Sequence, residues 1–281
     1  MTFVELNRIV PQQQVAPARF EIRESKIFVS KAENEILSGD RSNIEATREH
    51  LESAGLDVIA NLEISNCDRR LLESARQLHK QIVDQENIVK IGLSNLSFCE
   101  MGRQFDCELP DAVNAMIASY FTAASLYVAQ FPEWDQFTQN AAASELDADD
   151  VAEVHATADR IIGLLQNDEN LSDPEVPKTI VLIKEMMLSP GRTAKRAVFA
   201  MIRTLENLVS SVVHFGVNFV EKTAEKVIEE GSSLSSKVLI GLLYVALIGA
   251  SGIGNAALSA GAPWVNQAAE IVKRQIDKLE Q

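Results

Sequence analysis

The segment "KVLIGLLYVALIGASGIGNAALSAGAPWV", from Lys237 to Val265, carries no charge after its first lysine. Its residues Val238 to Ala257 match the length of about 20 apolar residues that crosses a bilayer core. Length and mean hydropathy favour a membrane span. A helix that is apolar on every face is also typical of the centre of a large helical protein. The segment therefore predicts a helix covered on all sides, by lipid or by protein, and both alternatives stay open.

Glycines are concentrated in this apolar segment. Small residues let two helices approach closely, whereas a glycine inside a helix costs roughly 1 kcal/mol unless packing compensates. We therefore expect a close contact or a helix break in "IGASGIG", and Pro263 is expected to begin a final helix. The candidate membrane or packing segment contains four glycines: Gly241, Gly249, Gly252 and Gly254.

A second apolar segment runs from Ala194 to Glu230 and has room for a helix of about ten turns. Its polar residues fall on one narrow stripe and the rest of its surface is apolar. On an ordinary surface helix, the apolar residues form the stripe and the polar residues cover the rest. In a bundle within lipid such a stripe would line the interior and be functional. In a bundle surrounded by water it would face the solvent. The candidate polar stripe consists of Arg203, Asn207, Ser210, His214 and Asn218.

The rest of the chain predicts one hairpin and many helices. "ARFEIRESKIFVSK", from Ala18 to Lys31, alternates apolar and polar residues around a polar turn, as a β-hairpin does. Helical spacing follows, with Asn43 expected to cap a helix that ends at Gly55. The fold class is therefore mainly α: a helical body with a small N-terminal β-hairpin and a C-terminal apolar helical hairpin.

Charge is distributed unevenly along the chain. Residues 1–190 hold 16 Lys and Arg against 32 Asp and Glu, whereas residues 191–281 hold 10 against 8. An acidic body repels nucleic-acid phosphates, so we expect no nucleic-acid partner. The expected segments are an N-terminal tail with the β-hairpin (1–31), an acidic helical body (32–166), a linker with a short helix (167–191) and a C-terminal apolar helical region (192–281).

A basic cluster precedes the long apolar segment, in "SPGRTAKR" from Ser189 to Arg196. It lacks the second glycine and the lysine-serine pair of a P-loop. Basic residues next to an apolar helix are typical of contact with anionic lipid, although a solvated helix start has the same composition. The candidate basic cluster consists of Arg192, Lys195 and Arg196.

No motif predicts catalysis, a cofactor or a metal. The histidines are too far apart for zinc-ligand spacing, and Cys99 and Cys107 are too far apart for a CxxC pair. The acidic stretch "ELDADDVAEVH" lacks the glycine and the terminal glutamate of a calcium loop, and acidic residues favour helix starts. We therefore expect a non-enzymatic protein without a catalytic, cofactor-binding or metal site.

Two functions are favoured, and an enzyme with a dispersed site is a third, less favoured alternative. The first is a membrane-anchored or membrane-active helical protein, whose acidic body regulates it or binds a partner and which lies at the cytoplasmic face of a membrane. The second is a soluble cytoplasmic interaction or scaffold protein, whose apolar hairpin is buried in its own bundle or in a homo-oligomer. Few cysteines indicate a reducing compartment. Expected partners are membrane lipid, another copy of the chain, or a protein that contacts the acidic body.

Overall fold

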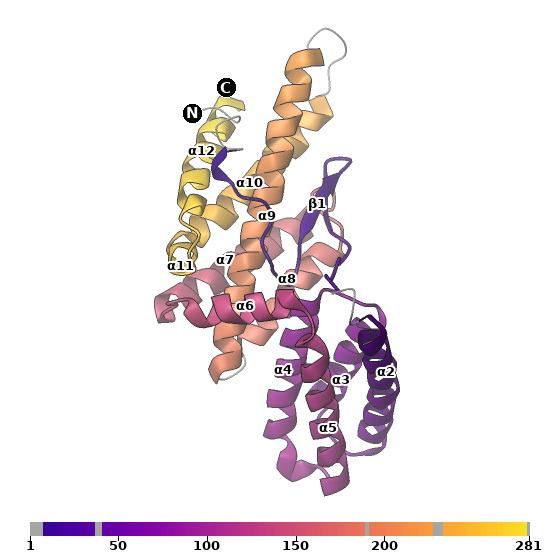
Figure 1. Cartoon of the computed structure of the whole chain (residues 1–281). Helices are drawn as coiled ribbons and strands as arrows, with labels where there is room; N and C mark the ends of the chain where they lie inside the picture. Colours follow the sequence, from indigo (N-terminus) through magenta and orange to yellow (C-terminus); the bar gives the residue numbers. More distant parts are fainter. Residues whose placement is uncertain (1–7, 37–40, 189–190, 227–232, 280–281) are drawn as a thin grey trace. The chain divides into compact units, whose positions relative to one another are not determined.

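The computed structural model describes residues 8–36, 41–188, 191–226 and 233–279, with the side chains of 191–192, 218–226, 233–237 and 278–279 outside the description. Within these residues the chain forms eleven helices and one two-stranded antiparallel hairpin, and it is 76% helical. The mainly α fold with an N-terminal hairpin is thus confirmed (Figure 1).

The hairpin consists of β1 (Phe20–Arg23) and β2 (Lys26–Val29). Its two turn residues, Glu24 and Ser25, have φ angles of 51° and 63°. Two left-handed residues in succession give the tight turn whose twist matches that of the paired strands. Strand β2 also exchanges backbone hydrogen bonds with the segment after α7: Ile27 N donates to Leu171 O (2.9 Å), and Asp173 N donates to Ile27 O (2.8 Å).

The chain divides into two compact units that differ from the expected segments. The four-helix unit comprises 31–142 and 186–197, and the C-terminal unit comprises 1–30, 143–185 and 198–281. The expected acidic body thus contributes to both units. The physical reason is packing, because the helix that follows residue 147 buries its apolar face against the C-terminal helices.

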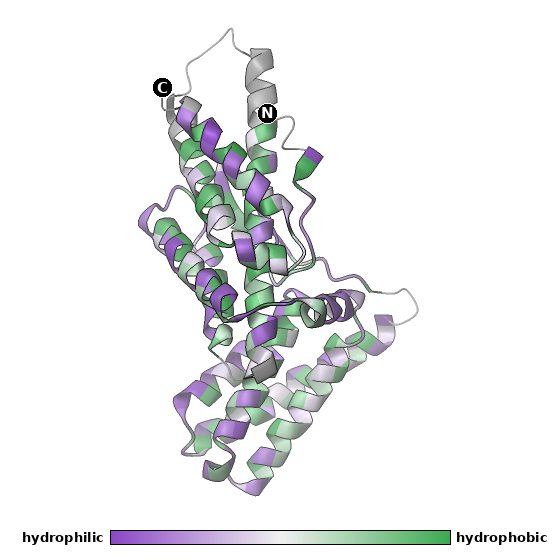
Figure 2. Ribbon diagram, turned by 90° about the vertical axis from the view of Figure 1, so that its left-hand side faces the viewer, coloured by the Kyte–Doolittle hydropathy of each residue, from purple (hydrophilic) through white to green (hydrophobic). Residues whose placement is uncertain are grey.

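The four-helix unit is a closed bundle in which α2 contacts α3, α3 contacts α4, α4 contacts α5, and α5 contacts α2. Short connections between consecutive helices favour this arrangement of neighbours. Figure 2 shows purple and green residues on each of these helices, as expected of amphipathic helices with one buried face. The helices are α2 (Arg41–Ile64), α3 (Arg69–Val83), α4 (Ile88–Gln104) and α5 (Asp111–Val128), with the 3-10 turn η1 (Asp106–Glu108) before α5 and with α6 (Pro132–Ala143) after it.

The prediction that Gly55 ends a helix is wrong, because α2 continues through it to Ile64. A Cβ at residue 55 would lie 2.5 Å from Nδ1 of His79 and 2.8 Å from Oη of Tyr120. Glycine is therefore needed for the close approach of α3 and α5. A single sequence cannot separate this role from that of a helix stop.

The C-terminal unit is built around α9 and α10. Helix α10 contacts α7 and α12, and α11 contacts the same two helices. A capping box at Asp147 and Asp150 begins α7, where each carboxylate accepts from the other residue's backbone N–H. The helices are α7 (Ala148–Asn167), α8 (Glu175–Met187), α9 (Gly191–Lys226), α10 (Ser233–Gly252), α11 (Gly254–Ser259) and α12 (Trp264–Leu279). The first residues of α9, up to Ala197, belong to the four-helix unit.

The apolar run from Val238 to Ala257 does not form one continuous helix, because α10 ends at Gly252 and α11 begins at Gly254. Within the described residues, the length and the apolar composition of a membrane span do not occur together in any single helix. The apolar part of α10, Val238–Gly252, is shorter than the about 20 residues that a span needs. Helices α5 and α6 meet both criteria only as a pair, with a bend of 98° between them.

Candidate functional site

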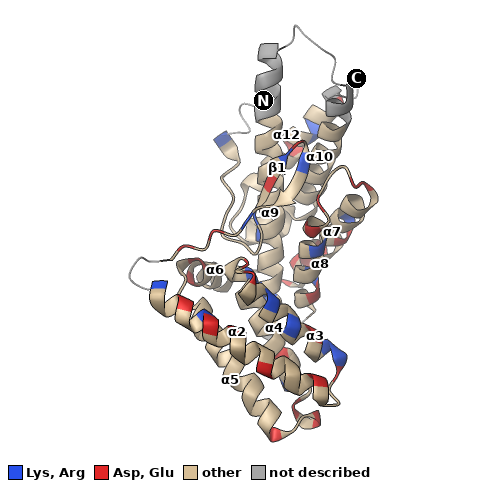
Figure 3. Cartoon of the chain, turned by 90° about the vertical axis from the view of Figure 1, so that its right-hand side faces the viewer, with Lys and Arg blue, Asp and Glu red and all other residues tan. Residues whose placement is uncertain are grey.

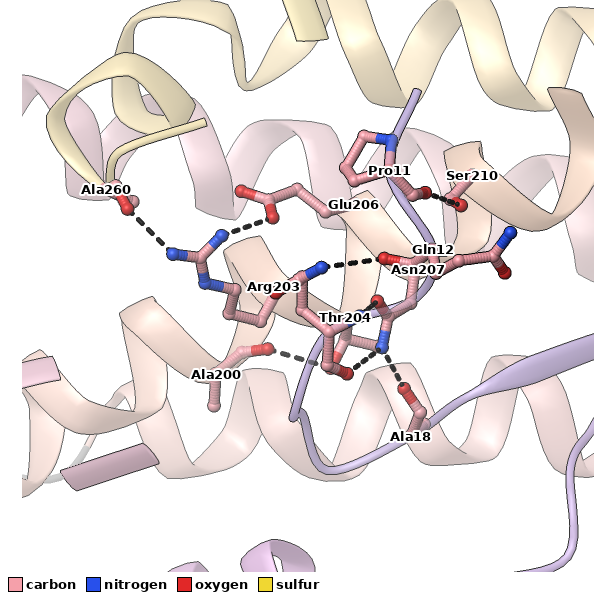
Figure 4. A network of polar contacts seen from close by, with 11 residues as sticks. Pro11, Gln12, Ala18, Ala200, Arg203, Thr204, Glu206, Asn207, Ser210 and Ala260 are labelled. Atoms are coloured by element: carbon pink, nitrogen blue, oxygen red, sulfur yellow. Dashed lines mark hydrogen bonds and ion pairs between the residues drawn. The ribbon is translucent and has the colours of Figure 1, made fainter. Parts of the chain in front are cut away.

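Helix α9 is buried on nearly every face between Ala197 and Val217. Figure 3 shows few charged residues along this helix, in contrast to α2, α3 and α4. Its interior polar side chains therefore need partners within the protein, since an unpaired buried polar group is costly. The structure supplies many of these partners from the extended segment Pro11–Ala18, which we call the N-terminal strap (Figure 4).

Asn207 makes the central contact with the strap. Its Oδ1 accepts from the backbone N–H of Gln14 (2.7 Å), and its Nδ2 donates to the carbonyls of Gln14 (3.0 Å) and Ala18 (2.9 Å). The amide thus bonds both backbone groups of Gln14, as an adjacent strand would. Only 1% of Asn207 is exposed, so water does not compete for these bonds.

Two further residues of the polar stripe converge on Pro11. Ser210 Oγ donates to the Pro11 carbonyl (2.8 Å), and His214 Nε2 lies 3.4 Å from the same oxygen. The structure therefore brings three of the five stripe residues to the strap. Arg203 points to another segment, and the side chain of Asn218 lies outside the described residues.

The sequence of the strap itself favours an extended conformation. Pro11 and Pro17 hold φ near −65° and have no backbone N–H to pair. Gln13 further fixes the segment by pairing with the backbone of Phe20, donating to its carbonyl (2.6 Å) and accepting from its N–H (2.7 Å). Ala16 and Ala18 are buried, so the contact surface accepts small side chains at these positions.

Arg203 forms the second half of the network. It donates to Oε2 of Glu206 (2.6 Å) and to the carbonyl of Ala260 (2.8 Å), in the loop between α11 and α12. Its guanidinium also lies 4.9 Å from the ring centre of Phe199, a favourable cation–π distance. Arg203 thus connects α9 to the end of the apolar hairpin.

Glu206 is 1% exposed, and burial raises its pKa to about 7 although the Arg203 guanidinium opposes the shift. Its Oε1 atom has no hydrogen-bond partner within the described part of the chain. The sequence interpretation did not include Glu206. A signal was available, because Glu206 is the only acidic residue between 191 and 220 and lies one helical turn after an arginine.

The polar stripe does not face water at Asn207 or Ser210, each of which is 1% exposed. The expectation for a bundle in water is therefore wrong at these positions. An extended segment lacks a sheet or helix to pair its backbone, and the stripe supplies the missing donors and acceptors.

The four candidate glycines each lie where a side chain would meet another part of the unit. A Cβ at Gly241 would lie 2.7 Å from Leu171, and one at Gly249 would lie 3.0 Å from Val209. A Cβ at Gly252 would overlap Thr157 Oγ1, and one at Gly254 would overlap the amide of Asn266. Thr157 Oγ1 donates to Gly252 O (2.6 Å), and Asn266 Nδ2 donates to Gly254 O (3.2 Å), so both ends of the helix break are held from neighbouring helices.

The basic cluster lies at the start of α9, within the four-helix unit. Lys195 is exposed, with Nζ 3.5 Å from the Ala142 carbonyl at the end of α6. Arg196 is half-buried and lines a cavity. The side chain of Arg192 lies outside the described residues.

Among the side chains that the structure describes, no group of three or more His, Cys, Asp or Glu is arranged to hold a metal ion. No protein-family model, curated protein or solved structure matches the chain. The arrangement on α9 is suited to binding: an amide, a hydroxyl and an imidazole converge on the main chain of an extended peptide. Such contacts recognise backbone more than side chains.

Proposed function

We propose that the protein is a non-enzymatic helical interaction protein, in which α9 holds an extended peptide segment. In this structure the strap of the same chain occupies that site. The observation that carries the proposal is the paired hydrogen bonding of Asn207 to both backbone groups of Gln14. A partner peptide with small residues and prolines would make the same contacts after displacing the strap.

The burial of the apolar hairpin supports an interior role for it. Leu242, Leu243, Val245 and Ala246 of α10 are each fully buried among protein atoms. Glycine contacts with α7, α9 and α12 also favour a hairpin packed within the unit. This supports the scaffold function over lipid insertion.

The acidic surface is proposed as a second contact region, for a basic protein partner. The four-helix unit holds 12 Lys and Arg against 18 Asp and Glu, and charge complementarity increases the rate of association. Free cysteines at Cys67, Cys99 and Cys107 support a cytoplasmic location.

The test uses the full chain and a fluorescent synthetic peptide of residues 8–20, followed by fluorescence anisotropy. Gln14→Pro in the protein removes the N–H that donates to Asn207 and so weakens the strap. We expect this variant to bind the peptide at least tenfold more tightly than the wild type, where the attached strap competes at high effective concentration. Adding Asn207→Leu should reduce peptide binding at least tenfold again.

A peptide with Gln12→Ala is the matched control, because the Gln12 side chain is exposed and should bind as the unchanged peptide does. A peptide with Gln14→Pro should bind poorly. Equal binding of all three peptides, or no binding to the Gln14→Pro protein, would contradict the proposal.

Membrane activity is the second candidate, and the apolar helix Val238–Gly252 favours it. In this alternative, release of the strap frees the α10–α12 hairpin to enter lipid. Flotation with anionic vesicles, followed by carbonate washing, separates the two functions. Recovery of the Gln14→Pro protein with the washed vesicles, but not of the wild type, would support membrane activity.

A further inference from the structure

The four-helix unit contains a cavity of about 250 Å³ that the strap does not involve. Its walls come from α4, α5, α6 and the first turns of α9, all within one unit. The lining residues are Gly92, Asn95, Leu96, Ser125, Val128, Trp134, Thr138 and Arg196. We propose that this cavity binds a small aromatic carboxylate, with Arg196 holding the carboxylate and Trp134 contacting the ring.

Arg196 provides the charge selectivity. Among the residues that the structure describes, it is the only charged one in the lining, although the unit as a whole is acidic. Its guanidinium forms no ion pair within the described residues. A half-buried guanidinium with its donors available is suited to bind a carboxylate through two parallel hydrogen bonds.

Trp134 provides the aromatic surface, and its position depends on Gly92. A Cβ at residue 92 would overlap the six-membered ring of the indole, so glycine is required for the tryptophan to lie against α4. The ring is also stacked on Phe137, with 5.9 Å between centroids and 23° between planes. A ring fixed in this way loses little conformational entropy when a flat ligand contacts it.

The hydroxyl and amide donors of the lining are already used within the protein, so they offer nothing to a second anionic group. The hydroxyls of Ser125 and Thr138 already donate to the carbonyls of Phe121 and Asp135. Asn95 Nδ2 is likewise used, donating to Phe121 O (3.1 Å) and Ser125 Oγ (2.9 Å). Arg196 therefore supplies the donors for the anion, and Leu96 and Val128 supply apolar contact.

The volume limits the ligand to about one or two fused rings, because small-molecule sites enclose most of the ligand surface. The probe is 2-naphthoate, and 2-naphthamide is the matched ligand with the same rings and no charge. Binding is followed by the indole N–H resonances in ¹H–¹⁵N spectra of the full chain. The chain has two tryptophans, so Trp264 of the C-terminal unit is an internal control.

We expect 2-naphthoate to move the Trp134 resonance saturably and to leave Trp264 unchanged, with 2-naphthamide binding at least tenfold more weakly. Arg196→Gln should weaken 2-naphthoate binding at least tenfold. Lys195→Gln removes the neighbouring charge without altering the lining and should bind as the wild type does.

Three outcomes would overturn the proposal: an unmoved Trp134 resonance, equal affinity in Arg196→Gln and wild type, or equal affinity for the two naphthalene ligands. Inorganic phosphate is titrated in parallel. A phosphate response at Trp134 without one to 2-naphthoate would also overturn it, since the site would then select an inorganic anion. None of these results depends on the strap.

Discussion

Both units pair charged side chains at the surface, but the C-terminal unit also holds an extended segment through buried polar side chains. In the four-helix unit, charged side chains pair at the surface, as Arg76 does with Glu63 and Glu73. In the C-terminal unit, Asn207 and Ser210 are buried and bond the main chain of a segment almost 200 residues away. The difference follows from backbone pairing. Helices satisfy their own interior backbone groups, whereas the extended strap must find partners on another element.

Both units also contain buried polar atoms that have no hydrogen-bond partner among the described residues. In the four-helix unit, His79 Nδ1 and Tyr120 Oη are buried without a hydrogen-bond partner in the described part of the chain. Burial lowers the pKa of His79 and raises the pKa of Tyr120, so both side chains favour their neutral forms. In the C-terminal unit, Arg203 and Glu206 place an ionisable pair next to the apolar hairpin.

The largest expected effect comes from placing a charge in α10. Leu243 is fully buried, so Leu243→Arg would bury an unpaired guanidinium and lower the free energy of unfolding by about 3–5 kcal/mol. Thermal and urea unfolding, followed by circular dichroism, measure the change. Leu258→Arg is the control, because Leu258 is 57% exposed and this change should have little effect. Equal stability of the two variants would mean that α10 is not enclosed by protein.

Glu206 should make the C-terminal unit less stable as pH rises. Its folded-state pKa of about 7 lies above the value of 4.5 expected in the unfolded chain, so the folded state binds the proton more tightly. As pH rises from about 4.5 to just above 7, the free energy of unfolding should therefore fall by up to about 3 kcal/mol.

Glu206→Gln should remove this contribution and raise stability at pH 8 relative to wild type. Urea titrations at several pH values measure the difference between the two proteins. The exposed Glu185→Gln controls for loss of one negative charge. If Glu206→Gln and wild type keep a constant difference in stability from pH 5 to pH 8, the assigned pKa is wrong.

The helix break should tolerate no side chain. Gly252→Ala would press a Cβ into Thr157 and lower the free energy of unfolding by about 1–3 kcal/mol. The additional change Thr157→Ala should recover part of the loss, because it removes the overlapping atoms. Differential scanning calorimetry of the single and double variants tests this pairing, and identical values for both would show that the strain lies elsewhere.

The smallest expected effect has the opposite sign. Gly163 is inside α7, and a Cβ there would meet no atom within 4 Å. Gly163→Ala should stabilise the protein by about 0.5–1 kcal/mol through helix propensity. A destabilised Gly163→Ala protein would mean that α7 is covered on that side, for example by a second copy of the chain.

Sequence reasoning could predict the local elements. The apolar spacing after Ala194 indicates about ten turns, and α9 has 36 residues. The hairpin at 20–29 and the helices after Pro110 and Pro263 also follow from local signals. These features depend on residues close in the chain, so one sequence carries the information.

Only half of the candidate site, the polar face of α9, could be predicted from the sequence. Helical spacing groups Asn207, Ser210 and His214 on one face, but it does not identify the strap as their partner. Nothing in "PQQQVAP" indicates a contact with residues almost 200 positions later. The two compact units depart from sequence order for the same reason, because α7 follows the acidic helices in sequence and packs on α10 in space.

The long separation between the strap and Asn207 has a consequence for biosynthesis. The sequence separation of 193 positions from Gln14 to Asn207 takes roughly 10–40 s to translate at about 5–20 residues per second. During this time the strap emerges without its binding site, while the bundle of α2–α5 already has all its helices. The nascent chain thus exposes "RIVPQQQVAPA" to the chaperones and other proteins around the ribosome, and any of them that binds it competes directly with closure of the C-terminal unit.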